Sequence, residues 1–181
     1  MSTIPGYKAG TWTVDTAHSE VGFVIRHLMV SKVRGKFTSF NATFTTGENP
    51  LDSTVTATVD LASIDTSNAD RDAHIRSADF FDTDSNVEMS FVSTSIREDD
   101  DDFVLVGDLT IKGITKSVEL ELELGGFGPD PYGGYRCGFS AEGEINRNDF
   151  GISFNAPLEA GGLMLGEKVK IALEVEAVLN A

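Results

Sequence analysis

The chain has 181 residues, which fits a single domain, and its hydrophobic content of 40% excludes wholesale disorder. A formal net charge of −15 argues against a nucleic-acid partner, because phosphate contacts need clustered lysine and arginine, and it disfavours an anionic membrane surface as the main partner. The single cysteine, Cys137, excludes an intrachain disulfide and a metal–thiolate cluster.

The first residues contain no apolar stretch of the kind found in a signal peptide. No run in the chain approaches the roughly 18–20 apolar residues of a membrane-spanning helix. We therefore expect a cytoplasmic protein without stable membrane insertion, in which residues 1–9 form a loose N-terminal segment.

Apolar and polar side chains alternate repeatedly along the chain, which is typical of β-strands with one buried face. The alternation shifts by one residue after Phe37, which predicts a β-bulge near Thr38–Ser39. The predicted strands are 11–15, 20–26, 33–37, 40–44, 54–61, 87–91, 103–111, 118–124, 135–145 and 169–177.

One helix interrupts these strands, at about 68–78, with Asn68 or Asp70 as its N-cap. The acidic run Glu98–Asp102 predicts a hairpin tip, and residues 125–134 predict a longer loop rich in glycine and proline. Because the alternation continues on both sides of the helix, we expect one domain over residues 1–181.

About eight to ten strands with regular turns predict an all-β fold, and a closed barrel would leave no exposed strand edge. Barrels of about eight strands either fill with their own side chains or enclose one small ligand. Small residues at inward positions leave room inside the barrel and favour a cavity. The alternative is a packed barrel, in which small residues fit the narrowing of the interior. These positions are Gly35, Ala42, Ala57, Gly107, Ala141 and Gly143.

The three histidines, His18, His27 and His74, show no ligand spacing, so we predict no metal site. Asp15, His18 and Ser19 suggest a catalytic triad, but close neighbours on a turn seldom have its geometry, so a hydrogen-bonded turn is favoured.

Two arginines stand apart from the alternating pattern. Arg71 lies on the predicted helix and Arg147 at a strand end. Such arginines either hold a helix on a barrel or receive an anionic head group. The structural role is favoured on the pattern alone.

The stretch between Glu20 and Glu48 contains no acidic residue, although the protein as a whole is strongly acidic. Four basic residues lie within it: Arg26, Lys32, Arg34 and Lys36. Only alternate residues of a strand share a face, so only part of this set can converge on one site.

A series of short motifs runs in order from about Gly10 to Val178, and their number and order are highly specific. They are Asp15-Thr-Ala-His18-Ser19, Phe23 to His27, Gly35-Lys-Phe37, Ser63-Ile-Asp-Thr66, Arg71-Asp-Ala-His74, Ser77-Ala-Asp-Phe-Phe81, Met89-Ser-Phe91, Gly107 to Lys116 and Arg147-Asn-Asp-Phe-Gly-Ile152. In these motifs the chain resembles the YceI-like family. The resemblance implies an eight-stranded antiparallel lipocalin-like barrel that binds a long-chain isoprenoid lipid or related amphiphile in an elongated apolar channel. It implies no catalytic residue.

We accordingly predict an apolar channel and, near a mouth, cations or donors for a polar head. The predicted channel residues are Phe23, Ile25, Val33, Phe37, Phe40, Phe44, Met89, Phe91, Leu105, Leu109, Phe139 and Ile171. The predicted head-group residues are His18, Arg26, His27, Arg34, Arg71 and Arg147.

The favoured function is a carrier or storage protein, not an enzyme, whose small-molecule partner is a polyprenyl phosphate or an isoprenoid quinone. We expect a bound lipid of this type and no required cofactor. Three alternatives stay open: an enzyme that modifies such a lipid with His18, His27 or Asp72 as acid or base, a binder of fatty acids or fatty amides, and an interaction module with a packed barrel. A monomer and a homodimer are both compatible with the pattern.

Overall fold

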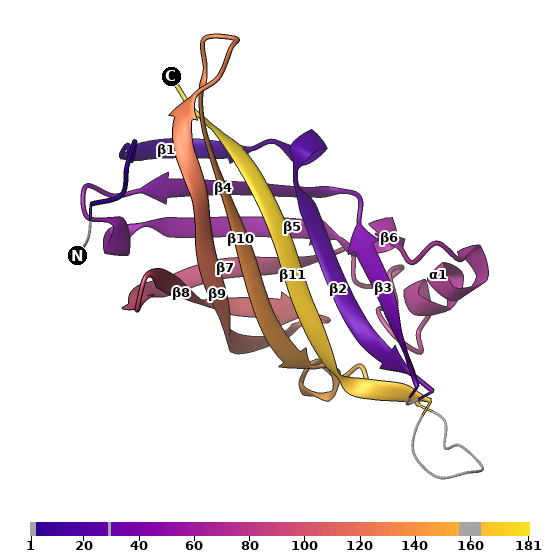
Figure 1. Cartoon of the computed structure of the whole chain (residues 1–181). Helices are drawn as coiled ribbons and strands as arrows, with labels where there is room; N and C mark the ends of the chain where they lie inside the picture. Colours follow the sequence, from indigo (N-terminus) through magenta and orange to yellow (C-terminus); the bar gives the residue numbers. More distant parts are fainter. Residues whose placement is uncertain (1–2, 29, 156–163) are drawn as a thin grey trace.

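The computed structural model describes residues 3–28, 30–155 and 164–181. Within them, antiparallel strands form one continuous sheet (Figure 1). The strands are β1 (Gly10–Val14), β2 (Glu20–His27), β3 (Ser31–Phe37), β4 (Phe40–Thr46), β5 (Thr54–Asp60), β6 (Ile64–Asp65), β7 (Glu88–Asp99), β8 (Asp102–Ile111), β9 (Ile114–Pro129), β10 (Tyr135–Asn146) and β11 (Leu165–Leu179).

The sheet closes on itself because β1 pairs with β4 on one side and with β11 on the other. This gives an eight-stranded barrel in the order β1-β4-β5-β7-β8-β9-β10-β11, which β2, β3 and β6 extend beyond β11. Strand β11 is long enough to pair with β2 along most of its length and with β1 at its end. The predicted eight-stranded antiparallel barrel is confirmed.

The predicted β-bulge near Thr38–Ser39 is instead a break between two strands, because β3 ends at Phe37 and β4 begins at Phe40 with different partner strands. Phe37 and Phe40 both contribute to the interior, and the two residues between them make the change of phase. The N–H of Thr38 donates to the carbonyl of Ser63 at 3.2 Å, and the carbonyl of Ser39 accepts from the N–H of Asp60 at 2.9 Å. The backbone therefore stays hydrogen-bonded where the alternation breaks.

The helix α1 (Ala69–Arg76) lies beside β6 at one end of the barrel (Figure 1). The side chain of Asn68 caps it by accepting from the N–H of Arg71 at 3.0 Å. The helix ends slightly earlier than predicted, because Ser77 adopts an extended conformation. Polar contacts hold it in place, among them the Nε of Arg76 donating to the carbonyl of Ala62 at 2.9 Å.

The predicted loop at 125–134 is shorter than expected. Residues 125–129 belong to β9, and this part of the strand pairs with the start of β10 across a register shift between Gly138 and Phe139. The glycines carry no side chains, so the alternation disappears from the sequence while the backbone ladder continues. The two-residue strand β6 is too short to show any alternation.

Residues 3–9 contact the barrel, although the sequence suggests a loose segment. The hydroxyl of Tyr7 donates to the carbonyl of Gly47 at 2.7 Å, and its ring meets Phe127 edge to face. The carbonyl of Lys8 accepts from Thr46 at 2.7 Å. These contacts lie beside fully buried Trp12, whose indole stacks on Phe44. This end of the barrel is therefore densely packed with aromatic rings.

Candidate functional site

A cavity of about 730 Å³ lies inside the barrel, within the range of about 300–1,000 Å³ typical of small-molecule sites. Its lining includes residues near both barrel ends, from Tyr7 and Phe127 to His74 and Phe80. All twelve residues predicted to line an apolar channel are on its wall. The inward faces of other strands contribute too, for example Leu120 and Leu122 of β9, whose alternation with glutamate already signalled an inward face.

The inward glycines Gly35 and Gly107 do not enlarge the cavity as the sequence suggested. A Cβ atom at Gly35 would lie 2.3 Å from the Cζ atom of Phe23, and one at Gly107 would lie 2.3 Å from the Cζ atom of Phe91. Each glycine thus makes room for the phenyl ring of a residue on the neighbouring strand. The alanines Ala42, Ala57 and Ala141 do line the cavity itself.

The aspartate, arginine and histidine side chains on the cavity wall gather near α1, together with His27 on β2 and Arg147 beyond β10. Asn68, Asp70 and His74 are both exposed to solvent and part of the lining, so the cavity meets solvent here. The ring of His74 also contacts Phe80 and Phe154 edge to face, each at 5.1 Å. This end therefore combines an apolar interior with a polar margin.

Arg147, in the 3₁₀ turn Arg147–Phe150, is only 4% exposed. Its Nε donates to the carbonyl of Gly166, and one terminal nitrogen donates to the carbonyls of Ile152 and Phe154, all at 2.8 Å. The other terminal nitrogen has no partner among the described residues. Burial lowers the pKa of this guanidinium, an effect that the nearby Glu167 carboxylate opposes. A buried donor on a cavity wall can serve an acceptor oxygen of a ligand.

Arg71 reaches the same end of the cavity from α1. Its Nε donates to the hydroxyl of Thr66 at 2.8 Å, and a terminal nitrogen donates to the Thr66 carbonyl at 2.6 Å. Buried Asp72 accepts from the Thr66 N–H at 2.9 Å and from its hydroxyl at 2.5 Å. Arg71 thus holds the helix to the barrel while part of it faces the cavity.

Three of the six predicted head-group residues lie elsewhere. Arg26 and Arg34 are exposed on the outer faces of β2 and β3, and neither they nor His18 line the cavity. The alternation itself contained this information, because Ile25 and Val33 point inward and their neighbours must point outward. Inside the cavity a head group would instead meet His27, Arg71 and Arg147.

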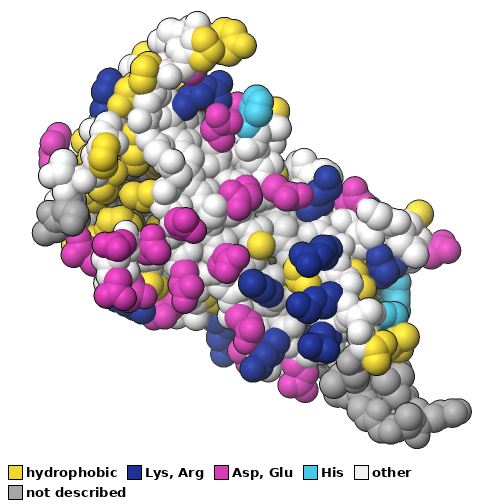
Figure 2. Space-filling view, in the orientation of Figure 1, with side chains coloured by type: hydrophobic (Ala, Val, Ile, Leu, Met, Phe, Trp, Pro, Cys, Tyr) yellow, Lys and Arg dark blue, Asp and Glu magenta, His cyan; other side chains and the backbone are white. Residues whose placement is uncertain are grey.

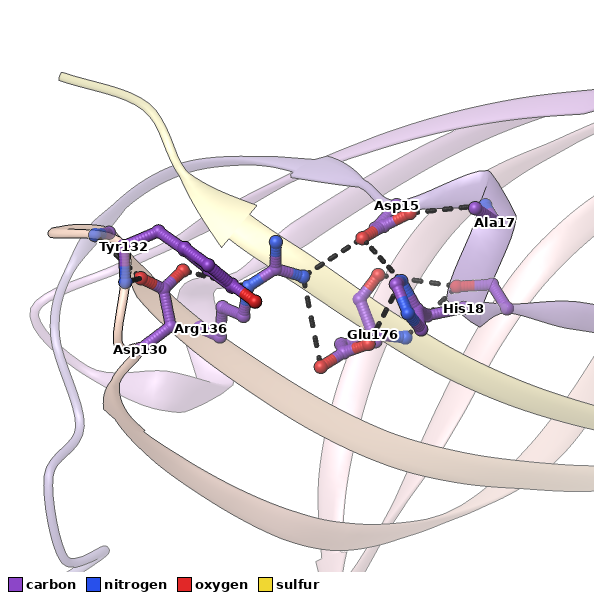
Figure 3. A network of polar contacts seen from close by, with 9 residues as sticks. Asp15, Ala17, His18, Asp130, Tyr132, Arg136 and Glu176 are labelled. Atoms are coloured by element: carbon purple, nitrogen blue, oxygen red, sulfur yellow. Dashed lines mark hydrogen bonds and ion pairs between the residues drawn. The ribbon is translucent and has the colours of Figure 1, made fainter.

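His18 belongs to a surface network at the corner between β1 and β2 (Figure 3). Its Nδ1 lies 2.9 Å from the Asp15 carboxylate, which is also 2.9 Å from Arg136. Arg136 in turn contacts Asp130 at 2.8 Å. Hydrogen bonds from Arg136 and then from His18 lower the pKa of Asp15 to about 2. The favoured hydrogen-bonded turn is present, since the N–H of Ala17 donates to Asp15 at 3.1 Å.

Folding also brings Glu176 to this corner, so that ligand atoms of Asp15, His18 and Glu176 all lie within 4.8 Å of one another. The sequence could not reveal this group, because Glu176 is on the last strand. The guanidinium of Arg136 lies 3.7 Å from Glu176 and already compensates both carboxylates. The arrangement is that of an ion-pair network.

Cys137 lies in the barrel wall with its side chain on the cavity, and burial raises the pKa of its thiol to about 12. The thiol is therefore protonated at neutral pH and a poor nucleophile.

No described helix has the length and apolar character needed to cross a bilayer.

Comparison with known proteins places the chain among proteins of this architecture. A family model described as the YceI-like domain matches residues 12–177. The UPF0312 protein SERP2314 of Staphylococcus epidermidis is 45% identical over 164 residues, which cover 90% of this chain and 94% of that protein. Protein YceI of Escherichia coli is 48% identical over 136 residues, covering 75% and 71%.

A solved structure, a polyisoprenoid binding domain from Saccharophagus degradans implicated in plant cell wall breakdown, superposes with a TM-score of 0.69. It is 12% identical and covers 93% of this chain and 98% of its own. At that identity the likeness concerns the fold.

Proposed function

The chain belongs to the YceI-like family, and from that premise we propose that it binds a long-chain isoprenoid lipid inside its barrel and acts as a carrier or storage protein. The observation that carries this proposal is the 730 Å³ cavity with an almost wholly apolar wall. The structural neighbour described as a polyisoprenoid binding domain supports the choice of ligand class.

The physical basis is the burial of an apolar chain. Each Å² of apolar surface removed from water contributes about 25 cal/mol, so a chain of several isoprene units needs few polar contacts. The cavity wall provides phenyl rings and branched aliphatic side chains that a prenyl chain can contact throughout.

We place the head group near α1, where Arg147 and Arg71 line the cavity. The terminal nitrogen of Arg147 that has no partner among the described residues is a buried donor, and a phosphate or quinone oxygen would satisfy it. A phosphate would add charge pairing with both guanidinium groups, so a polyprenyl phosphate fits this end better than an uncharged head.

The test is a binding titration with a prenyl phosphate, the prenyl alcohol of the same chain length, and a fatty acid. We expect tight binding of the phosphate, weaker binding of the alcohol, and loss of both in Ala57→Phe, which places a ring in the cavity. Thr56→Phe, the neighbouring outward position on β5, is the matched control and should bind as wild type. Equal binding by the two variants, or preference for the fatty acid, would contradict the proposal.

An enzyme acting on a lipid in the cavity is the second candidate. Of its three candidate acid–base residues, only His27 lines the cavity, since His18 belongs to the surface network and Asp72 is bound to Thr66. We therefore propose binding without turnover. Chemical change of a bound prenyl lipid on long incubation, abolished by His27→Ala, would reverse this choice.

Cytoplasmic location stays a prediction, and monomer and homodimer stay the two alternatives for the oligomeric state. Light scattering at several protein concentrations distinguishes these two states directly.

A further inference from the structure

Basic side chains gather on the outer face of β2, β3 and β11, although the protein carries a net charge of −15 (Figure 2). All six are exposed, and we call them the basic face: Arg26, Lys32, Arg34, Lys36, Lys168 and Lys170. Acidic side chains predominate on the adjoining part of the surface in this view. The surface charge is therefore unevenly distributed, which the net charge of the protein does not reveal.

The strand pairing concentrates like charges. Arg26 lies directly opposite Lys32, and Arg34 and Lys170 flank Val24 from the two neighbouring strands. Like charges opposite one another destabilise a sheet. Lys168 and Lys170 approach Glu144 and Glu142 at 3.7 and 3.8 Å, but Lys32, Arg34 and Lys36 form no ion pair with any described residue. Ion pairs within the protein therefore do not account for Lys32, Arg34 and Lys36, whereas an external anionic surface would.

The turn between β2 and β3 adds exposed apolar side chains to this face. Val30 is 82% exposed and Leu28 is 41% exposed, and we call these two residues the apolar tip. Leu28 has a left-handed φ of 55°, which is uncommon for a bulky apolar residue, and its N–H donates to the carbonyl of Met164 at 2.7 Å. An apolar tip beside cations matches the chemistry of peripheral proteins at a lipid interface.

The tip also adjoins the cavity. His27, immediately before Leu28, lines the cavity, and so does Met164, which holds Leu28. A membrane that met the tip would therefore lie close to the barrel end that combines apolar wall and polar margin.

We propose that the basic face and the apolar tip form a docking surface for a lipid bilayer that contains anionic lipid. This inference goes beyond the proposed function, because it concerns where the protein meets a membrane and stands whether or not the cavity holds lipid. The net negative charge does not oppose it, since at physiological salt charges farther than about 8 Å from the bilayer are largely screened. A single-stranded nucleic acid fits less well, because the basic face includes no aromatic side chain on which bases could stack.

The test is co-sedimentation of the full chain with vesicles of phosphatidylcholine alone and with added phosphatidylglycerol. We expect binding to the anionic vesicles only, and release at high salt. Lys32→Glu with Lys36→Glu should lower the partition coefficient at least about tenfold, since each cation near such a surface contributes and each new anion is repelled. Val30→Asp should lower it several-fold.

The matched control is Lys112→Glu with Lys116→Glu, which makes the same change in net charge at the β8–β9 turn. It should bind anionic vesicles as wild type does. Absence of wild-type binding, or equal loss in the two double variants, would overturn the proposal, as would binding to short single-stranded DNA without binding to vesicles.

Uptake of a prenyl phosphate in vesicle-free solution separates this proposal from the proposed function. The Lys32→Glu, Lys36→Glu variant should retain uptake while losing docking. A wild-type protein that docks but takes up no lipid would refute the proposed function and leave the docking surface standing.

Discussion

At the scale of single residues, Asp15 shows how a surface carboxylate acquires structural importance. It accepts hydrogen bonds from Arg136, His18 and the backbone of Ala17, and it joins β1 to β10 across the corner in Figure 3. The sequence pointed to a hydrogen-bonded turn here but not to Arg136, which is distant along the chain. Long-range partners of this kind depend on strand order, which local patterns do not specify.

The lowered pKa of Asp15 predicts a dependence of stability on acidic pH. Because the folded carboxyl titrates at about 2 and the unfolded one near 3.8, its contribution is complete above the unfolded value and is lost as pH falls toward 2. Arg136→Met removes the largest cause and also a partner that lowers the pKa of Asp130. Urea unfolding from about pH 5 to pH 2 should therefore show a shallower decline for this variant than for wild type. The exposed variant Lys116→Met is the control and should lose stability with falling pH as wild type does. An equally steep decline in Arg136→Met and wild type would contradict the role of Arg136 in lowering the pKa of Asp15.

Arg147 should be a major contributor to stability, because its side chain holds three backbone carbonyls. Arg147→Met leaves three carbonyls without their donor, and we expect a loss of about 2–5 kcal/mol in the free energy of unfolding. Arg97, which is exposed and pairs with Glu119, is the comparison, and Arg97→Met should lower the free energy of unfolding far less than Arg147→Met does. Similar losses in denaturant titrations of the two variants would contradict the role given to Arg147.

At the scale of elements, the strands and α1 follow from patterns that are visible in the sequence. Alternation with period two indicates the inward face of each strand, and Asn68 supplies the capping group at the start of α1. Two structural features could not be predicted from these patterns. The end of β9 contains glycines that erase the alternation, and β6 is held by its pairing with β3 at Phe37 rather than by any propensity of its own.

Helix α1 consists mostly of charged residues, and its one buried side chain is that of Asp72. Its position on the barrel should therefore depend on the buried hydrogen bonds between Asp72 and Thr66. Asp72→Ala removes the acceptor for the N–H and hydroxyl of Thr66, which is itself buried, and should cost about 2–4 kcal/mol. Asp70→Ala, exposed on the same helix, should cost less than about 1 kcal/mol. Hydrogen exchange of the α1 amides should rise in the first variant only, and equal exchange in both would contradict this account of the helix.

At the scale of the whole molecule, the barrel wall was far more predictable than its polar end. Phe23, Ile25 and the other predicted channel residues line the cavity, because the alternation along a strand alone decides which side chains point inward. The polar end depends on where α1 and the turn at Arg147 lie against the barrel, and no local pattern specifies that. His18 illustrates the difference, since the turn after β1 places it outside.

The most direct measurement is organic extraction of the purified protein followed by mass spectrometry. We expect a co-purified lipid with a long isoprenoid chain in wild type and in Thr56→Phe, and none in Ala57→Phe. Repeated extracts of wild type without any lipid, together with no uptake of added prenyl phosphates, would contradict the central claim that the barrel interior is a lipid site.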